Sequence, residues 1–220
     1  MKPYFETELG VLYHGDCLEI MPGLEPVDLV LTDPPYNVGV KYEVSDDNIS
    51  LEDYSNSIKL FKATIGTVDA MMLLGSKTET LLTWWKVFND AKQIIIRVGA
   101  TVNTVLGGMR PQYRSLLTTR KSKKWWSDLW EDIRFPGEGY FFNEERFPHP
   151  CHAPIRLMSK CLQGFTEDSE TILDPYIGSG TTAVACERLN RRWIGIEISE
   201  KYCEIAAQRI TRERQQLRMF

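Results

Sequence analysis

The sequence of 220 residues predicts an α/β fold with a mostly parallel sheet, for three reasons. Short apolar runs alternate with helical patterns, and this alternation is typical of parallel strands joined by crossover helices. The apolar run Val27–Thr32 stops at two consecutive prolines, which cannot continue a β ladder. Beyond Thr171 the chain contains a complete strand–helix–strand–helix unit.

In the first half of the chain, apolar runs give the strands and helical periodicity gives the helices between them. The polar stretch Asn37–Ser50 interrupts this pattern and is expected to be a mobile loop, of which Asn37–Asn48 could close over a substrate. The expected elements are strand Val11–Gly15, helix Leu18–Met21, strand Val27–Thr32, helix Leu51–Ile65, strand Asp69–Gly75, helix Thr78–Asn89 and strand Gln93–Val98.

In the second half, Tyr113–Arg120 alternates enough to predict a strand, antiparallel and at the edge of the sheet. Lys121–Pro148 has no clear period and is rich in aromatic residues, Pro and Gly, so it is expected to be a small irregular insertion in a single domain. The remaining elements are helix Ile155–Leu162, strand Thr171–Leu173, turn Gly178–Gly180, helix Thr181–Leu189, strand Trp193–Ile198 and a last helix beginning at Glu200.

Composition excludes several classes of function. The net charge is −4, so a protein that binds nucleic acid must gather its basic residues on one surface. No apolar run approaches the roughly 18–20 residues of a bilayer span, and the N-terminus lacks a signal-peptide pattern, so we expect a cytoplasmic protein. His149, Cys151 and His152 have no second ligand pair elsewhere, so no metal site is expected.

The first chemical motif is Asp174–Thr182, which reads DPYIGSGTT, follows a strand and opens a helix. Its glycines let the backbone turn sharply and approach a ligand, and the helix N-terminus offers free N–H groups. Glu197 lies 23 positions after Asp174 at the end of the next strand, where an acidic side chain binds ribose hydroxyls. A nucleoside-type cofactor is therefore predicted, with contacts from Asp174, Tyr176, Gly178, Ser179, Gly180, Thr181 and Glu197.

The second motif is the tetrapeptide Asp33-Pro34-Pro35-Tyr36, at the end of a buried strand. In open α/β sheets, ligands bind at that end of the strands. Asp33 and the Pro34 carbonyl can each accept a hydrogen bond from an amino group, and the Tyr36 ring can stack on a planar base. The alternative is a strand that simply ends at prolines, with a surface tyrosine.

Together the two motifs resemble the signature of the DNA amino-methyltransferases, which transfer a methyl group from S-adenosylmethionine (AdoMet) to adenine N6 or cytosine N4. The tetrapeptide is similar to their catalytic motif, and DPYIGSGT to their AdoMet-binding motif. The catalytic motif comes first, which is the circularly permuted order of the beta group. The resemblance extends from about Val11 to Ile210 and implies a Rossmann-like AdoMet-dependent methyltransferase fold.

The resemblance assigns two further residues to the cofactor. Asp16 falls where the family has an acidic residue near the cofactor's adenine. His149 lies in a segment similar to the block before the AdoMet motif. That block usually contains Thr-Gln-Lys-Pro, whereas this chain has Cys-His-Ala-Pro, with Ala153 in place of the lysine. We therefore expect an altered grip on the methionine end of AdoMet.

The resemblance also implies a mechanism without a cysteine nucleophile, because an exocyclic amine can attack the methyl group directly. Asp33 and the Pro34 carbonyl would hold the two N–H bonds, with Pro35 rigidifying the motif and Tyr36 holding a base flipped out of double-stranded DNA. In this family an aspartate at the first catalytic position mostly accompanies adenine, which predicts adenine N6. The alternatives are N4-cytosine methylation, an RNA substrate, and a catalytically silent subunit that binds nucleic acid for a partner.

The densest basic stretch lies between Arg110 and Lys124 and is interleaved with aromatic residues, as in surfaces that bind nucleic acid. The alternative is a solvated edge strand. We expect Lys121–Pro148 to recognise the target and, because it is small, two chains to pair as a homodimer. Arg209 and three later arginines are expected to decorate an exposed helix tail. The predicted DNA contacts are Arg114, Arg120, Lys121, Lys123, Lys124 and Trp125.

Overall fold

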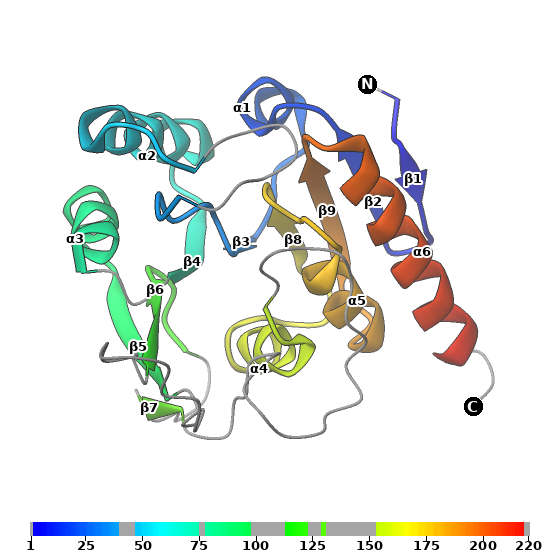
Figure 1. Cartoon of the computed structure of the whole chain (residues 1–220). Helices are drawn as coiled ribbons and strands as arrows, with labels where there is room; N and C mark the ends of the chain where they lie inside the picture. Colours follow the sequence, from blue (N-terminus) through cyan, green and yellow to red (C-terminus); the bar gives the residue numbers. More distant parts are fainter. Residues whose placement is uncertain are drawn as a thin grey trace, which may run out of the picture.

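A computed structural model of the chain describes residues 2–39, 47–74, 78–97, 113–122, 129–130 and 153–217. Within these ranges the fold is an α/β sandwich built on one sheet (Figure 1). The strands are β1 (Phe5–Glu6), β2 (Gly10–His14), β3 (Leu29–Thr32), β4 (Asp69–Leu74), β5 (Lys92–Arg97), β6 (Tyr113–Thr118), β7 (Leu129–Trp130), β8 (Thr171–Asp174) and β9 (Arg192–Glu197). The helices are α1 (Cys17–Ile20), the 3₁₀ turn η1 (Met21–Gly23), α2 (Leu51–Ile65), α3 (Thr78–Val87), α4 (Ile155–Phe165), α5 (Thr181–Arg188) and α6 (Glu200–Leu217).

The described strands follow the order β1-β2-β9-β8-β3-β4-β6-β5-β7 across the sheet. Five neighbouring strands, β2, β9, β8, β3 and β4, run parallel to one another. The strand that carries the Asp33 motif therefore lies beside the strand that carries the Asp174 motif, although 142 positions separate Thr32 from Asp174. The expected mostly parallel fold, with the Asp33 motif first in the chain, is confirmed.

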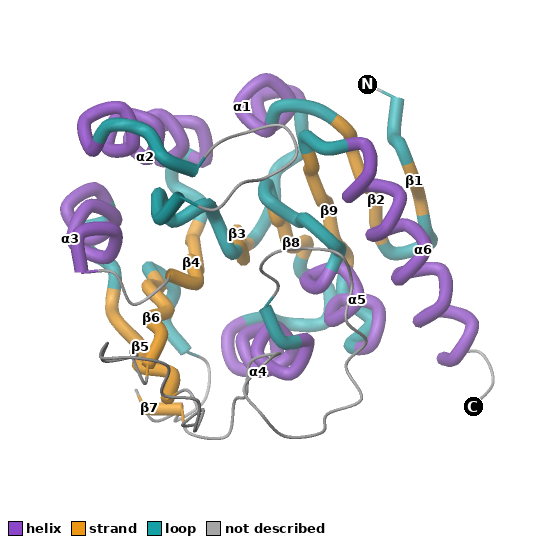
Figure 2. Tube along the Cα trace, in the orientation of Figure 1, coloured by secondary structure: helices purple, strands orange, loops and turns teal. Residues whose placement is uncertain are grey.

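Two hydrophobic cores cover the two faces of the sheet. One face packs against α1, α2 and α3, with Ile58, Phe61 and Trp84 among its buried side chains. The other packs against α4, α5 and α6, with Leu162 and Ala206 among its members. Figures 1 and 2 show these helices as separate layers on opposite sides of the strands. None of the helices in the described part of the chain has the length and apolar character of a membrane span.

Three features of the sheet differ from the sequence-based expectation. The strand β6 is antiparallel, as predicted, but it lies between β4 and β5 and not at the edge. The edge beyond it is formed by β7, which comes from the supposedly irregular insertion and pairs with β5. Trp130 of β7 is almost fully buried, so packing and not local periodicity selects this two-residue strand. At the opposite edge, β1 adds an antiparallel strand that was not expected.

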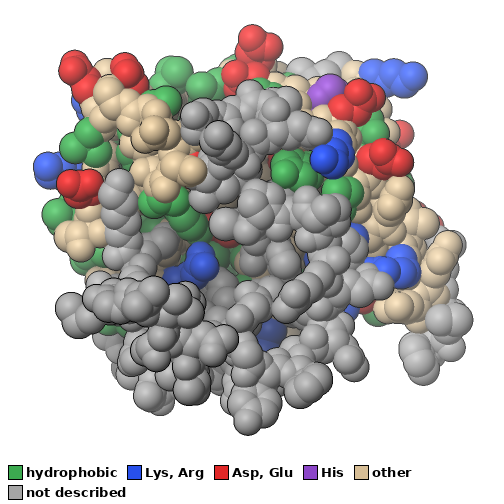
Figure 3. All heavy atoms as spheres, viewed as in Figure 1, with side chains coloured by type: hydrophobic (Ala, Val, Ile, Leu, Met, Phe, Trp, Pro, Cys, Tyr) green, Lys and Arg blue, Asp and Glu red, His purple; other side chains and the backbone are tan. Residues whose placement is uncertain are grey.

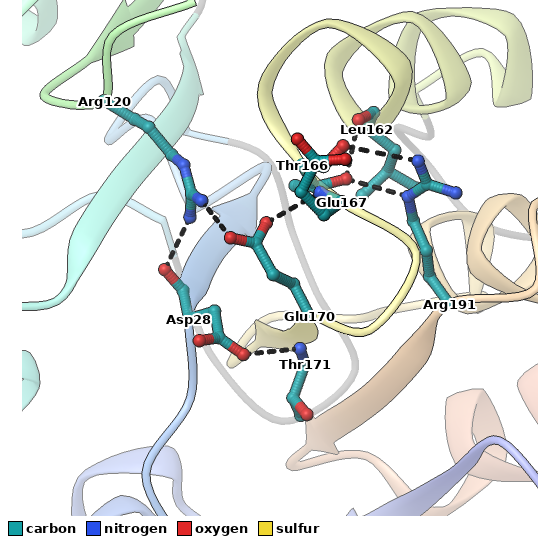
Figure 4. A network of polar contacts seen from close by, with 8 residues as sticks. All are labelled: Asp28, Arg120, Leu162, Thr166, Glu167, Glu170, Thr171 and Arg191. Carbon is teal, nitrogen blue, oxygen red and sulfur yellow. Dashed lines mark hydrogen bonds and ion pairs between the residues drawn. The ribbon is translucent and has the colours of Figure 1, made fainter. Parts of the chain in front are cut away.

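A polar network closes the edge where the parallel strands begin (Figure 4). Arg120 donates to the backbone carbonyl of Asp28 at 2.7 Å and forms an ion pair with Glu170. The Asp28 carboxylate accepts the backbone N–H of Thr171 at 2.8 Å. These contacts tie the segment after β6 to the first residues of β3 and β8. Since the Arg120 side chain is only 12% exposed, it is a structural residue of this edge.

We predict that Arg120→Ala destabilises the protein by about 1.5–3 kcal/mol, because hydrogen bonds to charged groups are lost at a largely buried position. Urea unfolding monitored by circular dichroism measures the loss. The matched control is Lys121→Ala, since Lys121 is exposed and its removal should change stability by less than about 0.5 kcal/mol. Equal stability of the two variants would contradict the structural role of Arg120.

Candidate active site

The carboxyl ends of β2, β9, β8 and β3 meet at one edge of the sheet, and the loops that follow them are drawn in teal in Figure 2. Each of these strands ends in, or is closely followed by, an acidic residue. In β/α sheets of this kind, ligands bind at this edge. The four acidic residues are Asp16 after β2, Glu197 at the end of β9, Asp174 at the end of β8 and Asp33 after β3.

Asp174 joins the two motifs. Its Oδ1 accepts the Thr32 hydroxyl at 2.7 Å, and its Oδ2 accepts the Thr182 hydroxyl at 2.5 Å. The backbone N–H of Tyr176 adds a third hydrogen bond at 3.1 Å. Burial raises the pKa of Asp174 to about 6, against the lowering effect of these hydrogen bonds. With 3% exposure, the carboxylate holds β3, β8 and the start of α5 together.

The glycine-rich turn adopts the conformation that its sequence predicts. Gly178 and Gly180 have φ values of 52° and 85°, in the left-handed region that favours glycine. A Cβ on Gly180 would lie 3.0 Å from the Cβ of Ala206, so α6 approaches the turn closely. The turn therefore depends both on positive φ and on the absence of a side chain.

Glu197 fixes the same turn from the side of β9. Its Oε2 accepts the N–H of Gly178, and its Oε1 accepts the N–H of Ser199, each at 2.9 Å. Burial raises the pKa of Glu197, and these backbone hydrogen bonds oppose the rise. Each carboxylate oxygen has a second lone pair, which leaves Glu197 able to accept ribose hydroxyls. Asp16 caps α1 through the N–H of Leu18 at 2.8 Å, and its side chain is exposed at this edge.

Arg209 was expected on an exposed helix tail, and that expectation is wrong. It is 7% exposed, and its Nη1 donates to the Ser179 carbonyl at 2.5 Å and to the Ser179 hydroxyl at 2.8 Å. The same atom contacts the Thr181 hydroxyl at 3.2 Å. The Ser179 and Thr181 side chains therefore face α6, and we expect their contacts to a cofactor to come from the backbone. This contact could not be predicted from local sequence patterns, because Arg209 and Ser179 are 30 positions apart.

Tyr176 and Cys17 meet next to Asp16. Burial raises the pKa of the Cys17 thiol to about 11, and the Tyr176 hydroxyl hydrogen-bonded to it opposes the rise. The Tyr176 ring packs against Phe61, with centroids 6.0 Å apart. Tyr176 thus connects the glycine-rich segment to the α2 layer.

Asp33 lies close to Tyr36 and Arg114. Burial raises the pKa of Asp33 to about 6, and the charge of Asp174 contributes to the rise. The Tyr36 hydroxyl, which donates to Asp33 Oδ1, and the Arg114 guanidinium both lower that pKa. Tyr36 is 8% exposed, so in this conformation its hydroxyl covers the carboxylate.

A cavity of about 180 Å³ opens beside the tetrapeptide. Pro34 and Pro35 form one wall and Tyr176 a second, and the rest comes from α2, from Trp84 of α3, and from Asp47 and Ile49 before α2. Aromatic and aliphatic side chains dominate the lining, with a small number of polar groups that include Asp47 and Tyr54. Cavities of this composition are typical of small-molecule sites.

The predicted DNA contacts do not lie together. Arg114, at the start of β6, is on the same edge as Asp33, because β6 runs antiparallel to β4. Arg120 and Lys121 follow the other end of β6 and lie on the opposite edge. Arg120 and Lys121 thus lie away from the edge that carries Asp33, and their DNA contacts stay predictions. Lys123, Lys124 and Trp125 lie outside the described residues, as does His149. On the face shown in Figure 3, the described Lys and Arg side chains are scattered.

Ala153, which stands where the resembled family usually has a lysine, lies within the described residues. Ala153 is buried in the core that α4 shares with the sheet, directly before Pro154, the residue that caps α4. A side chain packed in this way has no polar group to offer a ligand. The expectation of an altered grip on the methionine end of the cofactor remains a prediction.

Comparison with known proteins identifies the family. The model of the DNA methylases, N6_N4_Mtase, matches residues 70–208. The chain belongs to this DNA methylase family. The type II methyltransferase M.HpaI of Haemophilus parainfluenzae is 26% identical to this DNA methylase, over 90% of this chain and 73% of the relative. M.ScaI of Streptomyces caespitosus is also 26% identical, over 98% of this chain and 86% of its own length.

Solved structures show the same fold. The cytosine-N4-specific PvuII DNA methyltransferase superposes with a TM-score of 0.72 and 18% identity, over 96% of this chain and 93% of its own. M1.HpyAVI in complex with SAM superposes with a TM-score of 0.65 and 22% identity, over 91% of this chain and all of the other. The resemblance to beta-group DNA amino-methyltransferases is thus confirmed, and the cofactor of this family is AdoMet.

The residues of this DNA methylase fit that cofactor. Asp16 and Glu197 are carboxylates at the ends of neighbouring strands, suited to the amino and hydroxyl groups of a nucleoside. Gly178 and Gly180 leave a turn without side chains before the N-terminus of α5. These carboxylate acceptors, together with backbone N–H donors at an open turn and helix N-terminus, suit a nucleoside with a charged tail.

We predict that Arg209→Lys weakens AdoMet binding about tenfold, the effect of losing about 1.5 kcal/mol from a hydrogen bond to a charged group. A lysine cannot reproduce the planar fork that contacts Ser179 and Thr181. Isothermal titration calorimetry measures the affinity. Arg212→Lys, at an exposed position of the same helix, is the control and should bind normally. Normal binding by a folded Arg209→Lys protein would refute the role of Arg209.

Proposed function

We propose that this DNA methylase transfers the methyl group of AdoMet to N6 of an adenine flipped out of double-stranded DNA. The observation that carries the proposal is the position of Asp33, a carboxylate at the same edge of the sheet as Asp174 and Glu197, for which we propose a role in the cofactor site. An aspartate at the first position of the tetrapeptide favours adenine in this family. The family itself includes enzymes of both specificities, as the cytosine-N4-specific PvuII enzyme illustrates.

When bound, AdoMet supplies an electrophilic methyl group on a sulfonium. Asp33 and the Pro34 carbonyl accept the two N–H bonds of the target amine and orient its lone pair. As the nitrogen becomes tetrahedral and positive, both acceptors stabilise the developing charge. Asp33 then accepts the proton that leaves the nitrogen, a step suited to a carboxyl whose pKa is about 6.

Tyr36 has two parts in this proposal. In the described conformation its hydroxyl donates to Asp33, which keeps the carboxylate hydrogen-bonded before the substrate arrives. The entering amino group replaces that hydroxyl, and the ring then stacks on the flipped base. Pro35 keeps the backbone between the two groups rigid.

We also propose target recognition by residues 121–148 and pairing of two chains on DNA, since this region is small for a complete recognition domain. Arg114 keeps its place in the proposal as a basic residue at the catalytic edge. The second candidate function is N4-cytosine methylation, which the PvuII structure favours and which uses the same acceptors.

Methyl transfer can be tested directly. With methyl-labelled AdoMet and unmethylated duplex DNA, we predict label in N6-methyladenine after digestion to nucleosides and chromatography. Asp33→Ala should lower kcat by about 10²–10³, as expected when an electrostatic acceptor at the reacting atom is removed. Label in N4-methylcytosine would support the same mechanism but identify cytosine as the target base. Absence of label on DNA from a protein that binds AdoMet would reject the proposed function.

The pH dependence tests the charge of Asp33. The carboxylate must be ionised to accept N–H bonds, so kcat/KM should fall as the pH drops through about 6. Arg114 lowers this pKa, so Arg114→Met should raise it and move the acidic limb to higher pH. Arg114→Lys retains the charge and should leave the limb in place. An identical limb in the Met and Lys variants would show that Arg114 does not act on Asp33.

A further inference from the structure

Side chains from the helix layer hold the backbone directly after Pro34. The Tyr54 hydroxyl, from α2, donates to the Pro35 carbonyl at 2.9 Å. The Thr80 hydroxyl, from α3, donates to the Tyr36 carbonyl at 2.7 Å. Both side chains are buried, at 5% and 2% exposure.

Trp84 fixes the direction of the first of these hydrogen bonds. Its Nε1 donates to the Tyr54 hydroxyl at 2.8 Å. An indole N–H can only donate, so the Tyr54 oxygen accepts from Trp84 and its own proton points to Pro35. The order Trp84, Tyr54, Pro35 is therefore a directed chain of hydrogen bonds from α3 to the catalytic motif.

Asp47 binds the backbone of the two residues that follow Tyr36. Its carboxylate accepts the backbone N–H of Asn37 and, at 3.1 Å, that of Val38. The Asn37 side chain exchanges two hydrogen bonds with the backbone of Ile49, at 2.9 and 2.8 Å. Asn37 also has a positive φ of 55°, which these contacts stabilise. Every residue from Pro35 to Val38 thus has a backbone group bound by a side chain.

We propose that Tyr54, Thr80 and Asp47 are positioning residues that set the direction of the Pro34 carbonyl and of Asp33 for methyl transfer. This inference rests on the proposed function. Proline fixes φ of Pro34, and the ring of Pro35 restricts ψ of Pro34 to the extended region. Within that region, ψ of Pro34 still sets both its carbonyl direction and the place of Pro35. Anchoring the Pro35 and Tyr36 carbonyls therefore fixes the acceptor that the target amine needs.

The test compares Tyr54→Phe and Thr80→Val with wild type in single-turnover methyl transfer. Each variant keeps the shape of the side chain and loses one hydroxyl. The rate should fall about tenfold to a hundredfold, since a displacement near 1 Å at the reacting groups costs about 10² in rate. The KM for AdoMet should stay within about twofold, because Asp174, Glu197 and Arg209 are untouched.

Thr166→Val is the matched control. Thr166 is also buried, and its hydroxyl donates to the Leu162 carbonyl at 2.6 Å and accepts from Arg191 at 2.8 Å, at the far edge of the sheet (Figure 4). The control should lose thermal stability but keep the wild-type rate. Wild-type rates in both Tyr54→Phe and Thr80→Val, or an equal loss in Thr166→Val, would overturn the inference.

Amide hydrogen exchange gives a second readout that needs no substrate. The Asn37 and Val38 amides should exchange faster in Tyr54→Phe and Thr80→Val, and at the wild-type rate in Thr166→Val. Unchanged exchange in both variants would refute the positioning role even in an active enzyme. Failure of the proposed function has a different signature, because the wild-type protein itself would then transfer no label to DNA.

Discussion

The hydrogen bond between the Thr32 hydroxyl and the buried Asp174 carboxylate connects the two motifs of the proposed active site. Thr32 is the last residue of β3, directly before Asp33, and Asp174 is the last residue of β8, directly before the glycine-rich turn. Because Asp174 also holds Thr182 and the Tyr176 amide, one carboxylate links the end of β3, before the proposed catalytic motif, to the turn proposed to bind the cofactor. Its burial is costly, as the raised pKa shows, and the three donors offset that cost.

Around this link, each carboxylate of the site has its own environment. Asp174 is buried and Asp33 is half-buried close to it, and each has a pKa that burial raises to about 6. Asp174 is bound on both oxygens by fixed donors of the fold, whereas Asp33 is bound by Tyr36, a residue of the catalytic motif itself. Asp16 remains exposed. This gradation separates a structural carboxylate from one placed to meet a substrate.

The sequence predicted what depends on local pattern. The apolar run before Asp33, the prolines after it, and the glycines at positions 178 and 180 each have a physical cause within a short segment. Prediction from the sequence failed where the conformation of a residue depends on a contact with a residue far away in the chain. Nothing near Arg209 indicates that its guanidinium lies under Ser179. Likewise, one basic stretch contained both Arg114 and Arg120, and only the pairing of β6 with β4 places them at opposite edges of the sheet.

The close approach of α6 to the glycine-rich turn has a consequence for synthesis of the protein. Gly180 packs against Ala206, and the Arg209 guanidinium donates hydrogen bonds to Ser179 in the same turn. A growing chain on the ribosome therefore contains both motifs before it contains Ala206 and Arg209, the residues of α6 that contact the turn. Until α6 has been made and has packed, the turn at Ser179 and Gly180 lacks these contacts, so it reaches its final conformation only after both motifs have been synthesised.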